Sequence, residues 1–266
     1  MTESRATRMA LGIWAVLILL FLFVPIGIIV VYAFNSSNVQ GWPIDGLSTK
    51  WFSQTWHNQE MRDALWLSVR AALLATTISL LLGSAAAFAV HRFRFFGREA
   101  VSFLLVLPLA LPGIITGMAL NSFFTFWGID LSYLTIVIGH ATFCIVIVYN
   151  NVVARLRRTS TSLVEASMDL GASGWQTFRH ITLPMISTAL LAGGLLAFAL
   201  SFDEVIVTTF TAGAQNTLPI WIFGKIRIGQ ELPEVNVVVV GVLLVTFIPV
   251  TLAQRLTREP RAATTI

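Results

Sequence analysis

Long apolar stretches separated by short polar segments run through the chain, and this pattern predicts transmembrane helices. About 20 predominantly apolar residues are enough for a helix to cross a bilayer. Six stretches are long enough: residues 9–34, 71–90, 101–127, 131–154, 184–202 and 235–253. The fifth could continue to 212, because residues 205–212 (VIVTTFTA) also suit a helix. We therefore predict an all-α, polytopic membrane protein with six transmembrane helices.

Prolines and glycines inside these stretches predict local distortions. The sequence LPLALPG at 107–113 contains two prolines, and membrane helices tolerate proline where neighbours satisfy the freed backbone groups. We therefore expect the third helix to be bent. The adjacent Gly193 and Gly194 predict that the fifth helix approaches a neighbour closely, as small residues allow in membranes.

The composition agrees with a membrane protein. Of the 266 residues, 56% are hydrophobic and 11% are charged, which is unlike a soluble domain. Cys144 lies in an apolar stretch, and as the one cysteine it cannot form a disulfide within the chain, so we expect a buried structural residue. The first apolar stretch exceeds the roughly 7–15 residues of a signal-peptide core, so we expect it to remain as a span. No repeat or linker is evident, and we predict a single transmembrane domain over 1–266.

The distribution of basic residues predicts the orientation, because cytoplasmic loops carry an excess of lysine and arginine. If the N-terminus is cytoplasmic, 12 of the 17 basic residues lie on the cytoplasmic side. The five on the outer side are Lys50, Arg62, Arg70, Lys225 and Arg227. Both termini are then cytoplasmic, and so is the polar segment 162–184. The net charge of +4 could suggest a nucleic-acid partner, but this placement of the basic residues is that of a membrane protein, and we predict no nucleic-acid partner.

The polar segment 162–184 carries several helix start and stop signals. Ser162 with Glu165, and Ser173 with Gln176, have the spacing of a capping box, which begins a helix. Gly171 suits a left-handed residue that ends the first helix, and Pro184 can start the next span at little cost. These signals predict two short helices joined by a glycine hinge, suited to contact with another protein. An ordinary cytoplasmic loop is the alternative.

Two adjacent carboxylates, Asp203 and Glu204, follow the fifth apolar stretch. A carboxylate inside a membrane should face protein or water, because its insertion into lipid costs about 2.5–3.5 kcal/mol. On a continuous helix, Glu204 shares a stripe with Ser201 and Thr208, so we predict that Glu204 lines a polar pathway. Asp203 is then held by a partner group or lies near the outer mouth. Alternatively, both carboxylates only cap a helix that stops at Phe202.

Other motifs that carry chemistry are absent or weak. The sequence has no phosphate-binding G-x4-G-K-[ST] loop and no Cys/His metal spacing, so we predict neither a bound cofactor nor a metal. We also find no converging nucleophile and base, and we predict that the chain is not an enzyme. His140 lies inside a span, where an ionisable residue is a functional candidate. A neutral histidine that bonds a neighbouring helix is the favoured interpretation.

The residues Glu165-Ala166, Gly171, Ile181, Leu183 and Pro184 reproduce the spacing E-A-A-x3-G-x9-I-x-L-P. This segment resembles the EAA loop of membrane subunits of binding-protein-dependent ABC importers. Ser167 departs from it, standing where the family usually has a second alanine. The resemblance implies a type I ABC importer permease fold, in which a coupling helix in this loop docks into a separate ATP-hydrolysing subunit. The residues that it assigns to the coupling loop are Glu165, Ala166, Ser167, Asp169, Gly171, Ile181, Leu183 and Pro184.

Longer strings narrow the resemblance. SFDEVIVTTFTAG at 201–213, LPIWIF, LPEVN and GHATFC…YNNVVARLRRTS are similar to the spermidine/putrescine permease group. This implies a multi-pass protein of the bacterial inner membrane that works with two ATPase subunits, a second permease and a periplasmic substrate-binding protein. Membrane lipid surrounds it, and the ATPases bind the ATP. The implied cargo is a polyamine, and the pathway residues that we predict from helical spacing and from the cost of a carboxylate in the membrane are Asp203, Glu204, Ser201 and Thr208.

Three alternatives remain open from the sequence. A permease of the same type for another small cationic or zwitterionic solute, such as 4-aminobutyrate, would share these features. An ion-coupled secondary transporter would need intramembrane titratable groups, and Asp203, Glu204 and His140 are the candidates. A membrane-embedded enzyme would need a converging catalytic set.

Overall fold

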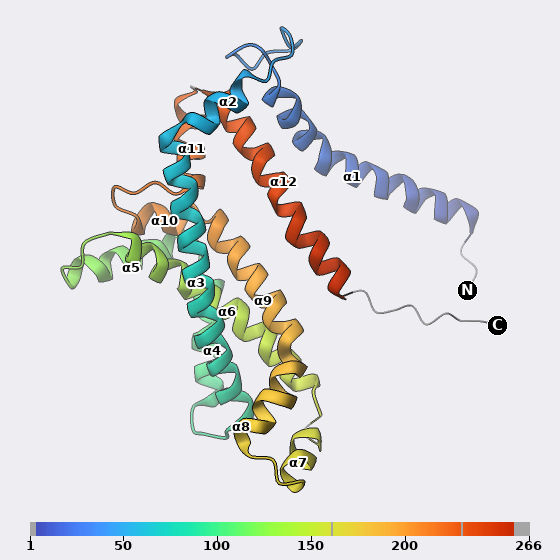
Figure 1. The fold of residues 1–266 in the computed structure, drawn as a ribbon, viewed down its shortest axis with the longest axis vertical. Coiled ribbons are helices and arrows are strands. Elements are labelled where there is room, and N and C mark those ends of the chain that lie inside the picture. Colours follow the sequence, from blue (N-terminus) through green and yellow to red (C-terminus); the bar gives the residue numbers. More distant parts are fainter. Residues whose placement is uncertain (1–3, 161, 230, 258–266) are drawn as a thin grey trace. The chain divides into compact units, whose positions relative to one another are not determined.

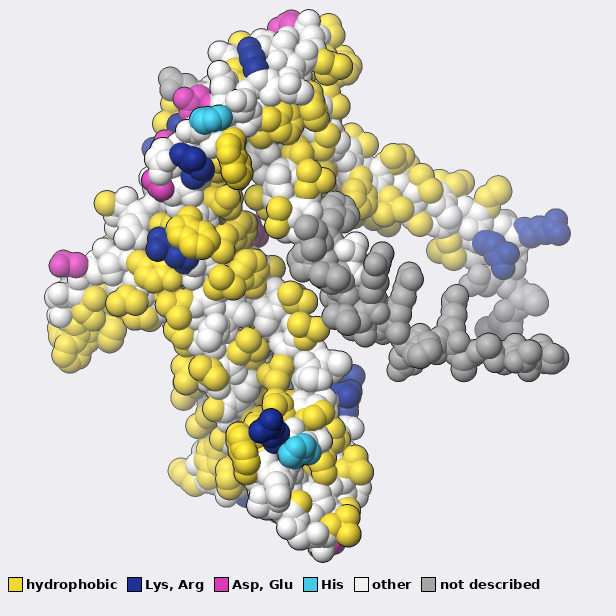
Figure 2. Space-filling model, in the orientation of Figure 1, with side chains coloured by type: hydrophobic (Ala, Val, Ile, Leu, Met, Phe, Trp, Pro, Cys, Tyr) yellow, Lys and Arg dark blue, Asp and Glu magenta, His cyan; other side chains and the backbone are white. Residues whose placement is uncertain are grey.

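The computed structural model describes residues 4–160, 162–229 and 231–257, with only the backbone for residues 6, 247–250 and 252–257. The described residues form helices joined by loops, with one isolated β-bridge between Asn35 and Leu47. Hydrophobic side chains cover much of the visible surface, and charged side chains are sparse on it (Figure 2). The predicted all-α fold is confirmed.

The chain forms two compact units, residues 1–61 with 222–266, and residues 62–221. The single domain over 1–266 remains a prediction. In the first unit, α1 (Arg5–Ala33) and α2 (Lys50–His57) pack on α12 (Leu232–Thr257). Its core contains Ala33, Trp51, Val237 and Val240. Trp51 Nε1 donates to the Asn35 carbonyl over 2.7 Å, which ties α2 to the end of α1.

The second unit contains every candidate functional residue and most of the helices labelled in Figure 1. Its helices are α3 (Gln59–Arg92), α4 (Arg98–Ala110), α5 (Gly113–Phe126), α6 (Tyr133–Arg158), α7 (Ser162–Asp169), α8 (Gly174–Thr177), the π-helical η1 (Phe178–Thr182), α9 (Leu183–Asp203), α10 (Ile206–Thr211) and α11 (Leu218–Ile228). The first turn of α3 and the second half of α11 belong to the other unit.

Helix α6 is the centre of this second unit. Of its apolar 18-residue window 67% is buried, the largest share among the four candidate spans of the described residues. It packs against α4, α5, α9 and α10. Val148, Val152, Ile186 and Ala197 form the α6–α9 part of the core. A β-carbon on Gly193 would lie 3.4 Å from Val148 Cα, so α9 does approach α6 closely, as predicted.

The structure confirms part of the span prediction. Among the described residues, four helical stretches are long and apolar enough to cross a membrane: Thr7–Ala33, Gln59–Arg92, Tyr133–Arg158 and Gly174–Asp203. α4 and α5 form a fifth candidate that is bent by 105° at the predicted proline segment. The sixth predicted span lies in α12, whose described apolar part is Leu232–Thr246. The total of six spans therefore remains a prediction.

The possible continuation of the fifth span to 212 is wrong. α9 ends at Asp203, and Glu204 is extended with φ −71° and ψ 119°. A short helix, α10, then follows over Ile206–Thr211. The sequence also did not reveal the short helices α2 and α11, because neither approaches the length of a span.

Gly83 sets how closely α3 and α6 approach each other. A β-carbon there would lie 2.8 Å from the Ile145 carbonyl oxygen, which is backbone and cannot rotate away. We expect Gly83→Ala to destabilise the purified protein by about 1–3 kcal/mol, the usual cost of overpacking. The measurement is the thermal unfolding midpoint in detergent. Gly113→Ala is the matched control, because the nearest atom to its β-carbon is 3.7 Å away. Equal midpoints for the two variants would contradict the close packing.

Candidate functional site

The segment after α7 has the glycine hinge that the sequence predicted. Gly171 is left-handed, with φ +84°. Its N–H donates to the Met168 carbonyl over 2.9 Å, and the Ala172 N–H donates to the Ser167 carbonyl over 3.0 Å. This pair of bonds is a Schellman motif, which satisfies the last carbonyls of a helix. The chain therefore turns sharply out of α7 at Gly171.

A second set of bonds fixes the turn between α7 and α8. Ser173 and Gln176 form the predicted capping box, with the Ser173 N–H donating to Gln176 Oε1 over 2.7 Å. Ser167 Oγ and Thr177 Oγ1 are 2.9 Å apart in a buried hydrogen bond between the two helices. The Ser167 hydroxyl, which replaces the usual alanine, is thus part of the loop's internal support. Sequence spacing alone could not reveal this bond.

The predicted capping box at Ser162 is wrong in register. Ser162 is the first residue of α7, not the residue before it. Its hydroxyl bonds Ser160 Oγ over 2.6 Å, and the Ser160 hydroxyl accepts the Ser162 N–H. Ser160 therefore supplies the side-chain oxygen at this helix start, two residues earlier than predicted.

The α7–α8 segment presents apolar and acidic side chains on its surface. Glu165, Ala166 and Asp169 are exposed, and Leu170 is 89% and Trp175 66% exposed. Ile181 is half-buried, whereas Leu183 and Pro184 are exposed, and Pro184 lies in the first turn of α9 as predicted. A cavity of about 340 Å³ lies behind α7, where its lining includes Phe88, Glu165, Met168, Phe178 and Ile186.

The other candidate site is the α9–α10 break, formed by Glu204 and Val205. Asp203 is the last residue of α9 and is exposed, and Glu204 is half-buried. Glu204 Oε1 accepts the Val207 N–H over 2.9 Å, so the carboxylate caps the start of α10. The Glu204 carbonyl accepts the Thr208 hydroxyl over 2.6 Å. The helical stripe that placed Glu204 with Ser201 and Thr208 is wrong, because it required an unbroken helix.

His140 brings Ser201 and Thr208 together across the break. Its Nδ1 is 2.7 Å from Ser201 Oγ in α9, and its Nε2 is 2.8 Å from Thr208 Oγ1 in α10. All three residues are buried. The structure therefore confirms the favoured interpretation of His140 as a histidine that bonds neighbouring helices.

Further contacts fasten α10 to α5 and α6. Asn121 Nδ2 donates to the Phe210 carbonyl over 2.7 Å, and the Thr135 hydroxyl donates to the Thr211 carbonyl over 2.7 Å. A β-carbon on Gly117 would lie 2.6 Å from the Phe210 ring, so α5 and α10 are in close contact. Asn121 and Thr135 are polar residues within apolar stretches, which is the one signal that marked them in the sequence.

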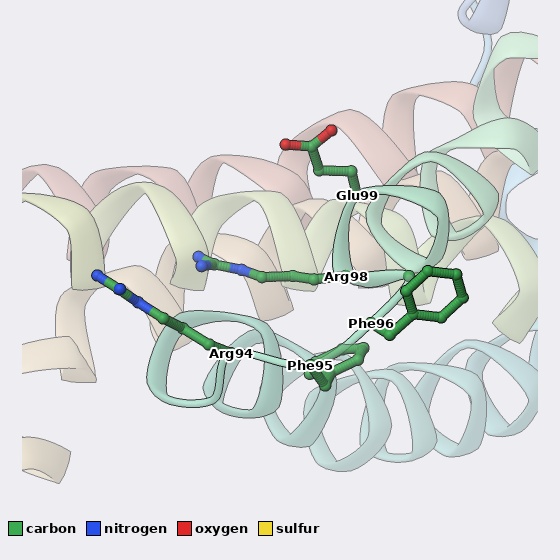
Figure 3. A pocket seen from close by; sticks show the side chains of 6 residues that line it. Arg94, Phe95, Phe96, Arg98 and Glu99 are labelled. Carbon is green, nitrogen blue, oxygen red and sulfur yellow. The ribbon is translucent and has the colours of Figure 1, made fainter.

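A surface pocket of the second unit has the wrong charge for a cation. It has a volume of about 600 Å³ and lies at the α3–α4 connection, where Arg94, Phe95, Phe96, Gly97, Arg98 and Glu99 line it. The two arginines extend in the same direction, away from the phenylalanine rings (Figure 3). Two positive charges against one negative charge make this hollow unfavourable for a cationic cargo.

Comparisons with known proteins decide the family. Residues 79–259 match the family described as "Binding-protein-dependent transport system inner membrane component". The chain belongs to this family. The permease therefore works in a transport system that depends on a binding protein and on ATP use by a partner ATPase. Family membership decides against the membrane enzyme and the ion-coupled secondary transporter.

Two relatives from Escherichia coli K12 extend over most of the permease. The putrescine transport system permease protein PotI is 39% identical over 236 residues, covering 84% of this chain and 83% of the relative. The spermidine/putrescine transport system permease protein PotC is 34% identical over 253 residues, covering 95% of each chain.

Solved structures agree on the fold. One chain of a bacterial ABC transporter involved in alginate import matches with a TM-score of 0.71 at 17% identity, covering 97% of the permease and all of that chain. A chain of an amino acid ABC transporter matches with a TM-score of 0.61 at 14% identity, covering 79% of the permease and 98% of that chain. The ABC importer permease fold that the resemblance implied is confirmed.

Proposed function

We propose that this permease forms the translocation path of an ATP-driven importer for polyamines, with putrescine and spermidine as the cargo. The 39% identity to the putrescine permease PotI, over 84% of the chain, carries the proposal. Polyamines are small flexible polycations, so their path needs negative charge. Coulomb attraction strengthens as the dielectric falls, so carboxylates beside a path shielded from water suit this cargo.

Asp203 and Glu204 are the carboxylates that we assign to the path. Asp203 is exposed at the end of α9, and Glu204 is half-buried with one carboxylate oxygen bonded to the Val207 amide. The second carboxylate oxygen of Glu204 is left to accept from an ammonium group. Ser201 and Thr208 are buried behind this pair, and we assign them to the same region of the path as its support.

We assign ATPase docking to the segment from α7 to the start of α9. Exposed Leu170 and Trp175 provide apolar anchors, and tryptophan is enriched at binding hot spots. Glu165 and Asp169 provide negative charge on the same short segment. The Schellman turn at Gly171 and the Ser167–Thr177 bond hold α7 and α8 in one fixed arrangement. A rigid segment with a mixed surface suits insertion into a cleft of another subunit.

Helix α9 links the two assigned sites. The helical stretch Gly174–Asp203 has 30 residues, and at about 1.5 Å per residue it is roughly 45 Å long, which exceeds the thickness of a bilayer core. In Figure 1, α7 and α8 lie at one end of α9, and α10 lies toward its other end. We propose that movement of the ATPase pair is passed along α9 to the α9–α10 break, as a rigid-body change between two states.

The assembly follows from these assignments. We propose a multi-pass protein of the bacterial inner membrane with both termini cytoplasmic, because this orientation places the docking segment beside the ATPases. Two ATPase subunits, a second permease and a periplasmic binding protein complete the importer. ATP binds to the ATPases, and this chain supplies no cofactor site.

The hinge at Gly171 provides a test of coupling. We expect Gly171→Val to uncouple ATP hydrolysis from uptake, because a β-branched residue at φ +84° is strained. The measurement is the uptake of labelled putrescine per ATP hydrolysed in proteoliposomes. Gly174→Val is the matched control. A β-carbon added at either glycine would meet no atom within 4 Å, but of these two glycines Gly171 alone has a positive φ. Unchanged coupling in Gly171→Val would contradict the hinge.

The carboxylates provide a test of cargo and path. We expect putrescine and spermidine to stimulate ATP hydrolysis by the complete importer with its binding protein. Glu204→Gln should raise the half-saturating polyamine concentration roughly tenfold, since about 1.4 kcal/mol of charge-assisted hydrogen bonding is lost. Asp130→Asn is the control, because it removes one exposed negative charge from the α5–α6 connection.

Three outcomes of this titration differ in meaning. If Glu204→Gln and Asp130→Asn raise the half-saturating polyamine concentration equally, the cause is long-range charge, and the path assignment is contradicted. Stimulation that is insensitive to Glu204→Gln would retain the importer and remove Glu204 from the path. Stimulation by 4-aminobutyrate instead of polyamines would contradict the proposed cargo.

A further inference from the structure

The buried His140 joins the two sides of the α9–α10 break. It is 1% exposed and comes from the central helix α6. Ser201 and Thr208, its two partners, lie on opposite sides of Glu204 and Val205. One imidazole ring therefore fixes the end of α9 relative to the start of α10.

The directions of these hydrogen bonds determine the tautomer of His140. The Thr208 hydroxyl hydrogen is used, because it donates to the Glu204 carbonyl over 2.6 Å. Thr208 Oγ1 must then accept from His140, so Nε2 carries the hydrogen. A neutral imidazole with Nε2–H leaves Nδ1 as an acceptor, and Ser201 Oγ donates to it over 2.7 Å. The chain of donors runs from Ser201 through His140 and Thr208 to the Glu204 carbonyl.

Other bonds around the break each hold one side of it. On the α9 side, Cys144 Sγ donates to the Ala197 carbonyl over 3.3 Å. On the α10 side, Asn121 and Thr135 hold the carbonyls of Phe210 and Thr211. These contacts anchor each segment to its neighbours, whereas the His140 ring contacts both segments. The Thr208 hydroxyl that His140 contacts in turn donates to the Glu204 carbonyl, so the chain of bonds reaches the backbone of Glu204.

We propose that His140 is a positioning residue that holds the Asp203–Glu204 pair in the orientation that receives the cationic cargo. The proposal rests on the assignment of that pair to the polyamine path. His140 does not touch the cargo. It acts through Ser201 and Thr208, which set the backbone at Glu204 and so the direction of the carboxylate. Without the ring, the end of α9 and the start of α10 lose their direct link and are held by their separate contacts to α5 and α6, so the position of the carboxylates is held less tightly.

The first readout is the α9–α10 distance, which does not depend on the cargo. Spin labels are placed on cysteines at the exposed Leu196 and Thr209 in the complete importer. The reference protein for this measurement also carries Cys144→Ser, which removes the native thiol and keeps a hydrogen-bond donor at this position. Pulsed electron paramagnetic resonance then gives the distribution of distances between the two spin labels. We expect His140→Leu and Thr208→Val to broaden it, and the double variant to be no broader than His140→Leu alone.

Two controls separate the proposed role from general loosening. Thr208→Ser keeps the hydroxyl, so it should keep the narrow distribution. Thr142→Val also removes a hydroxyl from α6, but that hydroxyl donates to the Gly139 carbonyl within the same helix. This variant should therefore leave the distance distribution unchanged. A narrow distribution in His140→Leu would overturn the proposal, and so would equal broadening in Thr208→Val and Thr208→Ser.

The second readout connects His140 to the cargo. His140→Leu should raise the half-saturating putrescine concentration for ATP hydrolysis about two- to twelvefold, which corresponds to the loss of about 0.5–1.5 kcal/mol of hydrogen bonding. The maximal rate should stay unchanged, because ATPase docking is not involved. If Glu204→Gln leaves half-saturation unchanged, the path assignment fails, and the distance readout still decides whether His140 holds α9 and α10 together. The positioning role would be overturned by one further result. In that result, His140→Leu broadens the distance distribution but leaves the half-saturating putrescine concentration unchanged, whereas Glu204→Gln raises that concentration.

Discussion

A helix that stops next to apolar surroundings leaves backbone carbonyl and amide groups without partners, and each must be satisfied by another part of the protein. The second unit of this permease depends on how that constraint is met at the two ends of α10, the short helix that follows the stop of α9 at Asp203. The Val207 amide is capped by the Glu204 carboxylate, and the carbonyls of Glu204, Phe210 and Thr211 accept side-chain hydrogens from Thr208, Asn121 and Thr135. Polar side chains from three helices thus stabilise one interruption, and this interruption holds the two carboxylates that we assign to the cargo path.

The opposite end of α9 is supported in a different way. Around Gly171 the bonds are local: a Schellman turn, a capping box at Ser173 and one hydroxyl pair between Ser167 and Thr177. Such a segment keeps its shape without extensive packing and leaves Leu170 and Trp175 exposed. A continuous helical stretch from Gly174 to Asp203 joins this end to the α9–α10 break. The arrangement suits a protein in which ATP hydrolysis at one side of the membrane changes a binding site toward the other.

Features set by local chemistry were predictable from the sequence. Four of the six predicted apolar stretches became helices long enough to cross a membrane, the prolines at 108 and 112 mark the 105° bend, and the left-handed glycine stands where the helix stop was expected. The α9–α10 break was not predictable, because residues 205–212 suit a helix by themselves. It is the bonds from His140, Asn121 and Thr135 that favour the interrupted form, and these partners lie about 60 to 90 residues away in the chain. Family membership was predictable from the spacing of residues in segment 162–184 and from longer strings around it, and the family match over residues 79–259 then showed it.

The central claim is that the α9–α10 break receives the polyamine. The most direct test is an electron cryo-microscopy map of the complete importer trapped with spermidine, at a resolution that shows the carboxylate of Glu204. We predict density for the polyamine with an ammonium group at hydrogen-bonding distance from Glu204, and Glu204 still bonded to the Val207 amide. Polyamine density elsewhere in the path, with Glu204 turned toward lipid or toward the protein interior, would contradict the account.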